Sequence, residues 1–190
     1  MKLLTIDLEL NKNNIGTTKI IQIGYVITDT ITGKVMHKQS LLVDPGEPID
    51  SFITELTGIT NEQIAASGRP LKDQYDVMVA DCKRLNVASL PAQWGIGDVY
   101  ALKEELGLTW DECIFKRRAI DVKAVYQAYA AFTGNTTKTG LASAMRQLGL
   151  TFEGLEHDAL NDAYNTYLVL KHLVDKMKLS DKILKAVAGK

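Results

Sequence analysis

The sequence is poor in cysteine and in long apolar runs, and it carries almost no net charge. Two cysteines in 190 residues cannot build a disulfide framework, so we expect a reducing, cytoplasmic location. No run approaches the roughly 20 apolar residues that a membrane-spanning helix needs. Asp7 and Glu9 interrupt the apolar N-terminal segment too early for a signal peptide. The formal charge of −1 excludes a polybasic protein that binds its partner through bulk charge.

The remaining composition is that of an ordinary globular protein, with 46% hydrophobic and 24% charged residues. A length of 190 residues fits one domain, and no low-complexity tract or flexible linker divides the chain. We therefore expect a single domain over residues 1–190, in which residues 175–190 form a C-terminal helix or a tail.

Three segments near the N-terminus have the composition of long strands: Leu3–Leu10, Lys19–Thr30 and Lys34–Val43. The short connections between them predict an antiparallel meander. Two further short strands are expected at Val87–Trp94 and Cys113–Arg118.

The rest of the chain has the apolar spacing and the capping residues of helices. These helices are expected at Asp50–Leu56, at Thr60–Ala66, at Leu71–Leu85, at Asp98–Leu106, from the cap Asp121 to Phe132, at Leu141–Leu148 with Thr139 at its start, and at His157–Met177. A strand meander followed by alternating helices and short strands predicts an α/β fold, with helices packed on the faces of a mixed sheet.

Two acids stand in the first predicted strand, where acidic residues are unfavourable. Asp7 and Glu9 are two positions apart and therefore point to the same face, whereas Ile6 and Leu8 point to the other. Two anions beside an apolar core are costly unless a cation shares them. A solvent-facing strand surface explains the pair equally well.

A histidine and an aspartate mark the start of the last predicted helix. Asp158 fits the role of N-cap, but Asp162 lies on the second turn, where capping no longer explains it. If His157 precedes the first turn, its ring can reach the space that Asp162 faces. A surface aspartate and a histidine tethered at a helix start are the alternative explanation.

A third acidic position follows two glycines. Gly95 and Gly97 allow a sharp turn at the end of a strand, so Asp98 would project from the edge of a sheet where ligands bind in open α/β folds. Helix capping also explains Asp98. Asp81 lies in the same intervening region, and Asp98 is preferred because Asp81 falls inside a periodic helix.

Taken together, these elements supply four carboxylates and one histidine. Hard oxygen ligands suit magnesium or manganese rather than zinc. Four anions around two divalent ions about 3.5–4 Å apart are typical of in-line phosphoryl chemistry. A histidine with a pKa near ~6.5 can take a proton from water.

In this order, the residues resemble the motifs of the DEDD superfamily of 3′→5′ exonucleases, the ribonuclease T and polymerase-proofreading type. The Asp-Leu-Glu run at 7–9 resembles the first exonuclease motif and Asp98 the second. His157 and Asp162, spaced as His-x4-Asp, resemble the third motif of the DEDDh branch.

Two non-catalytic segments, Ile20–Gly24 and Glu55–Thr60, strengthen the resemblance, which extends from about Thr5 to about Leu173. The resemblance implies a ribonuclease H-like fold and a metal-dependent exonuclease that removes nucleoside 5′-monophosphates from the 3′ end of single-stranded RNA or DNA.

The resemblance also assigns roles to the candidate residues. It implies that Asp7, Glu9, Asp98 and Asp162 hold two Mg²⁺ (or Mn²⁺) ions, and that His157 takes a proton from the attacking water.

Substrate contacts are implied at two places. Leu56 and Thr57 belong to a segment that packs near the terminal base in this family. Leu10 stands where the family often has threonine, at a position whose backbone contacts the terminal sugar, and Asn11 follows it.

Other functions remain open from the sequence. An enzyme of this fold limited to very short oligonucleotides is one alternative, and a non-catalytic nucleic-acid or protein adaptor is another. The intact set of five residues disfavours the adaptor, and the His-x4-Asp spacing disfavours an endonuclease of the ribonuclease H type. The sequence does not decide whether the substrate is RNA or DNA, or whether the protein is a monomer or a homodimer.

Overall fold

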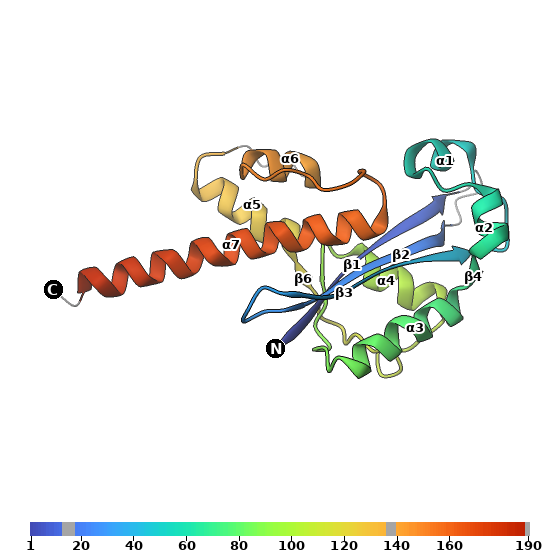
Figure 1. Ribbon diagram of the computed structural model, residues 1–190, viewed down its shortest axis with the longest axis horizontal. Helices are drawn as coiled ribbons and strands as arrows, with labels where there is room; N and C mark the ends of the chain where they lie inside the picture. The colour runs from blue at the N-terminus through green and yellow to red at the C-terminus, as the bar shows by residue number, and fades with distance from the viewer. Residues whose placement is uncertain (13–17, 136–139, 189–190) are drawn as a thin grey trace.

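A six-stranded sheet lies between two layers of helices in the computed structural model, which describes residues 1–12, 18–135 and 140–188 (Figure 1). The sheet order is β4-β3-β2-β1-β5-β6. The strands are β1 (Lys2–Lys12), β2 (Thr18–Asp29), β3 (Val35–Asp44), β4 (Arg69–Pro70), β5 (Ala92–Gln93) and β6 (Ile120–Asp121). The helices are α1 (Ser51–Thr57), α2 (Asn61–Ser67), α3 (Leu71–Arg84), α4 (Gly97–Glu105), α5 (Val122–Phe132), α6 (Leu141–Gln147) and α7 (Ala159–Ala188).

The predicted meander and the mixed sheet are confirmed. β1 pairs with β2 and β2 with β3, both antiparallel. The short strands β4, β5 and β6 pair in parallel with β3, β1 and β5 respectively. The tight β2–β3 connection is held by Asp29, whose carboxylate accepts the backbone N–H groups of Ile31 and Thr32, each at 2.9 Å.

The predicted strand at Cys113–Arg118 is wrong. Cys113 and Phe115 are buried, but the backbone of the segment bonds to other groups: the Ile114 N–H donates to the Tyr75 hydroxyl at 2.9 Å and the Lys116 N–H to the Ser89 carbonyl at 3.4 Å. The sheet position beside β5 is taken instead by β6, a few residues further along the chain.

The predicted strand at Val87–Trp94 is reduced to the two residues of β5. Val87 contributes only one isolated parallel bridge, to Lys2. Pro91 has no N–H with which to continue the ladder between these points.

Three helices have a predicted first residue as their N-cap. Asp50 caps α1, Thr60 caps α2 and Asp121 caps α5, each through its side chain. Thr139, the predicted start of α6, lies outside the described residues. The last helix begins at Ala159 rather than at His157 and continues to Ala188, so most of the C-terminal stretch is helical. Within the described residues, no helix is long and apolar enough to span a bilayer.

Side chains of β1 point alternately into two hydrophobic cores, one on each face of the sheet. Leu4, Ile6 and Leu8 are buried with residues of α3 and α4. Leu3 is buried on the other face, with residues of α5, α6 and α7. Figure 1 shows α7 crossing that second face. Asp7 follows Leu3 by an even number of residues, so its side chain points to the same face of the sheet. This is the face covered by the layer that contains α7.

Candidate active site

The two acids of β1 pair with two residues of β2 that also contact the start of α7. Asp7 pairs with Gly24, and Glu9 pairs with Gln22, so all four residues share one face of the sheet. Glu9 is only 8% exposed. The solvent-facing strand surface considered from the sequence is therefore excluded for Glu9, and its charge needs a partner inside the protein.

Gly24 and Gln22 fix the start of α7 on this face. A Cβ atom at Gly24 would lie 2.0 Å from the carbonyl carbon of Ala159, so only glycine allows the helix to approach β2 this closely. The Gln22 side chain accepts the N–H of Ala159 at 2.9 Å and donates to Asp158 Oδ2 at 3.1 Å. The resemblance singled out the segment that contains both residues, but this role in positioning α7 was not predicted.

The first turn of α7 brings His157 and Asp162 to Glu9. Asp158 acts as the predicted cap, since its Oδ1 accepts the Asn161 N–H at 2.9 Å. His157 precedes the helix, and its own N–H donates to Asp162 Oδ2 at 3.2 Å. One ligand atom from each of Glu9, His157 and Asp162 lies within 4.8 Å of the others. Five residues of sequence separation therefore do not keep the histidine and the aspartate apart.

Asp98 reaches the site from the other side of β1. It lies in the first turn of α4, immediately after β5. Gln93 of β5 is fully buried, and its Oε1 accepts the Val99 N–H at 3.1 Å, which ties the start of α4 to the end of the strand. The alternative acid is engaged elsewhere: Asp81 accepts the Tyr25 hydroxyl at 2.7 Å and pairs with Arg84.

The four carboxylates are at least partly buried and act on one another electrostatically. Burial, and next the charges of Asp98, Asp162 and other nearby acids, hold the pKa of Asp7 well above its usual range. Burial and the repulsion of Asp162 raise the pKa of Glu9 to about 8. Burial also raises the pKa of Asp98 to about 7 and that of Asp162 to about 6.

This arrangement can be compared with known proteins. Residues 4–170 match the family model described as exonuclease, RNase_T. The chain belongs to this exonuclease family. The resemblance to DEDDh-type 3′→5′ exonucleases that was drawn from the motifs is thereby confirmed.

Curated relatives of the exonuclease family are longer than this chain. ERI1 exoribonuclease 2 of Mus musculus is 28% identical over an alignment of 222 positions, which covers 99% of this chain and 31% of that protein. DNA polymerase III PolC-type of Streptococcus suis is 25% identical over 179 residues, 88% of this chain and 12% of that protein. The chain thus spans about a third or less of the length of these two relatives.

Solved structures share the fold. The nuclease domain of 3′hExo, a DEDDh family member bound to rAMP, has a TM-score of 0.78 at 17% identity and covers 92% of both chains. Exonuclease I of E. coli in complex with a dT13 oligonucleotide has a TM-score of 0.69 at 16% identity and covers 96% of this chain and 43% of that chain. The predicted ribonuclease H-like architecture is confirmed.

The donor set of this exonuclease site fits divalent metal ions. Four carboxylates supply hard oxygen atoms, and burial raises the pKa of each of them. In the described part of the chain, the basic residues seen in ion pairs face other acids, such as Asp76, Asp81 and Asp175. Magnesium or manganese would supply the missing positive charge.

The predicted substrate-binding residues of β1, Leu10 and Asn11, directly follow Glu9 in the strand. Leu10 is partly buried against the core, and Asn11 is fully buried. The Asn11 side chain accepts the Asp50 N–H at 2.9 Å and donates to Glu47 and to the Pro48 carbonyl, each at 3.2 Å, so it ties β1 to the segment before α1.

The two predicted substrate contacts in α1, Leu56 and Thr57, differ from each other. The Thr57 hydroxyl donates to the Ile53 carbonyl at 2.8 Å and accepts the Ile59 N–H at 3.1 Å, so it shapes the end of the helix. Leu56 is 40% exposed and is free to contact a ligand.

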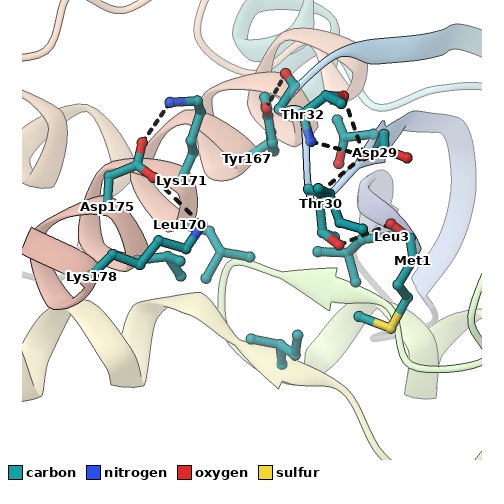
Figure 2. A pocket seen from close by; sticks show the side chains of 15 residues that line it. Met1, Leu3, Asp29, Thr30, Thr32, Tyr167, Leu170, Lys171, Asp175 and Lys178 are labelled. Atoms are coloured by element: carbon teal, nitrogen blue, oxygen red, sulfur yellow. Dashed lines mark hydrogen bonds and ion pairs between the residues drawn. The ribbon is translucent and has the colours of Figure 1, made fainter. Parts of the chain in front are cut away.

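A pocket of about 270 Å³ lies away from the carboxylate cluster, around the first residues of β1 (Figure 2). Leu3, Leu170 and Val174 contribute to a mostly apolar lining. The Tyr167 hydroxyl donates to the Gly33 carbonyl at 2.7 Å, which fastens α7 to the β2–β3 turn there. None of the candidate catalytic residues lines this pocket.

Proposed function

We propose that this member of the exonuclease family is a divalent-metal-dependent 3′→5′ exonuclease that acts on single-stranded RNA or DNA in the cytoplasm and releases nucleoside 5′-monophosphates. The observation that supports it most is that Asp98, Asp162 and His157, from two other parts of the chain, come together around Asp7 and Glu9 of β1. The likeness to exonuclease I bound to dT13 supports a single-stranded substrate.

The four carboxylates would hold two Mg²⁺ or Mn²⁺ ions, which when bound supply positive charge to the scissile phosphate and to the attacking water. Asp7 is the natural shared ligand because the charges of the other three all act on it. Glu9 and Asp162 would complete one ion site beside His157, and Asp98 would support the other.

His157 would take the proton of the attacking water. Its ring nitrogen lies near the ligand oxygens of Glu9 and Asp162, and the residue is exposed, so water and substrate can reach it. Its backbone N–H donates to Asp162, which ties the residue to the first turn of α7.

Exposed apolar side chains stand close in sequence to the catalytic residues. Ile96 is 63% exposed and lies two positions before Asp98, and Leu155 is 77% exposed and lies two positions before His157. With Leu56 of α1, they offer surfaces against which unstacked bases can pack. Such contacts would favour single strands over a duplex.

The direct test is a ladder assay with 5′-labelled single-stranded RNA and DNA, in the presence of Mn²⁺ or of EDTA. We expect stepwise shortening from the 3′ end that stops in EDTA. The Asp7→Asn variant, with the same fold, serves as the inactive control. If the wild-type chain degrades neither polymer with metal present, the adaptor function replaces the enzyme.

A further inference from the structure

His157 lies in an irregular segment whose backbone conformation is unfavourable. Its φ is +63°, in the left-handed region that a residue with a side chain rarely adopts. Such a conformation costs of order 1–3 kcal/mol and persists only where the surroundings impose it. The contacts on both sides of His157 therefore decide where its imidazole stands.

The upstream contact is a buried amide of α7. Asn165 is fully buried, and its Oδ1 accepts the Glu153 N–H at 3.0 Å. Its Nδ2 donates to the Glu153 carbonyl at 2.9 Å and to the Asn161 carbonyl at 2.8 Å. One side chain thus holds both backbone groups of Glu153 and fastens the segment to the helix.

The segment between Glu153 and His157 is pressed against the same helix. Gly154 has φ +82°, and a Cβ atom there would lie 2.4 Å from the Asn161 side chain. The Asn161 amide in turn donates to the Leu155 carbonyl at 3.2 Å. The path of the chain up to His157 therefore depends on side chains of α7.

The downstream contact is the buried amide of Gln22. It binds Asp158 and the N–H of Ala159, as described above, and its Nε2 also donates to the Ser40 hydroxyl at 3.0 Å. Only residues 154–157 lie between the two anchored points.

We propose that Asn165 is a positioning residue for His157, and that Gln22 positions both His157 and Asp162. Asp162 stands on α7 itself, so it keeps its place when the segment before the helix is released. Loss of Asn165 should therefore displace the histidine without disturbing the carboxylates. The inference rests on the proposed function in one respect, that His157 takes a proton in the reaction.

The kinetic test compares Asn165→Leu with Thr166→Val. Thr166 is equally buried, is next in the chain, and its hydroxyl has no hydrogen-bond partner within the described residues, so its replacement controls for packing. For Asn165→Leu we expect kcat to fall about 10- to 100-fold, the loss that a misplaced group of this kind can cause. KM and the affinity for Mn²⁺ should stay at the Thr166→Val values. For Gln22→Met, both kcat and Mn²⁺ affinity should fall.

A second readout needs no catalysis. The chain has three histidines, His37, His157 and His172, so the imidazole resonances are few enough to assign by single substitutions. Bound Mn²⁺ broadens nearby resonances, and the effect falls steeply with distance. We expect strong broadening of the His157 signal in the wild type and weak broadening in Asn165→Leu, with His37 and His172 unaffected in both.

These results separate the two proposals. If the wild type does not degrade nucleic acid but its His157 signal responds to Mn²⁺ and loses that response in Asn165→Leu, the positioning role stands and the proposed function fails. Equal kcat in Asn165→Leu and Thr166→Val, unchanged broadening of His157, or a parallel loss of Mn²⁺ affinity would each overturn the role of Asn165. Asn165→Ala, measured identically, replaces Asn165→Leu if the leucine variant does not fold.

Discussion

The clustered carboxylates should make the stability of the metal-free protein fall as pH rises. The pKa of Glu9 is raised from 4.5 to about 8 and that of Asp98 from 3.8 to about 7. At any pH between the ordinary and the raised pKa of a group, that group binds more protons in the native state than in the unfolded chain. The stability that these groups contribute is thus complete below their ordinary pKa values, and it is lost progressively as pH rises from about 5 to about 8.

The size of this effect follows from the same values. A tenfold change in a protonation equilibrium corresponds to about 1.4 kcal/mol, so the rise at Glu9 alone accounts for at most about 5 kcal/mol. The neighbouring acids titrate together with Glu9, so their contributions do not add in full. We expect a loss of about 3–5 kcal/mol between pH 5 and pH 8, or roughly 10 °C in Tm for a chain of this length.

Thermal denaturation in EDTA at several pH values between about 5 and 8 measures this loss. Mg²⁺ or Mn²⁺ should restore Tm most at the alkaline end, because the cations bind the ionised cluster. Asp7→Asn removes the charge on which the other three acids act, so its metal-free Tm should exceed that of the wild type at pH 8 and vary less with pH. A wild-type Tm in EDTA that is constant or rises from pH 6 to pH 8 would refute the electrostatic account.

Four further substitutions test separate parts of the site. His157→Ala should lower kcat about 10²- to 10⁴-fold with little change in Tm, since the side chain is exposed. Gly24→Ala should cost at least about 2 kcal/mol in urea unfolding and reduce activity, because its Cβ meets the backbone of α7; wild-type stability would contradict the close approach. Asp98→Asn should abolish most nuclease activity, whereas Asp81→Asn should lower stability and leave activity near wild type; the reverse pattern would exchange their roles.

Much of the fold could be predicted because its signals are local. The alternation in β1 identified the face of Asp7 and Glu9, and the capping chemistry of Asp121 identified the start of α5. The errors arose where distant residues decide the outcome. Cys113–Arg118 has the composition of a strand, but Tyr75 and Ser89 bind its backbone, and neither lies near it in sequence.

The candidate site shows the same division. The order and spacing of the acids predicted a cluster of Asp7, Glu9, Asp98 and Asp162, and the fold brings these four acids near one another. The choice between Asp98 and Asp81, however, depends on which carboxylate faces β1 in three dimensions. Gln22 carried a readable signal, a polar residue between isoleucines in a buried strand. Its partner Asp158 is 136 positions away, so its role appears only in the folded chain.

The central claim is that these residues form a hydrolytic site that acts from the 3′ end. It is tested most directly by digesting a single-stranded oligonucleotide in heavy-oxygen water with Mn²⁺ and analysing the first products by mass spectrometry. We expect the nucleotide from the 3′ terminus to appear first, as a nucleoside 5′-monophosphate with one heavy oxygen on its phosphate. Release from the 5′ end, internal cleavage, or a product without the label would contradict the account.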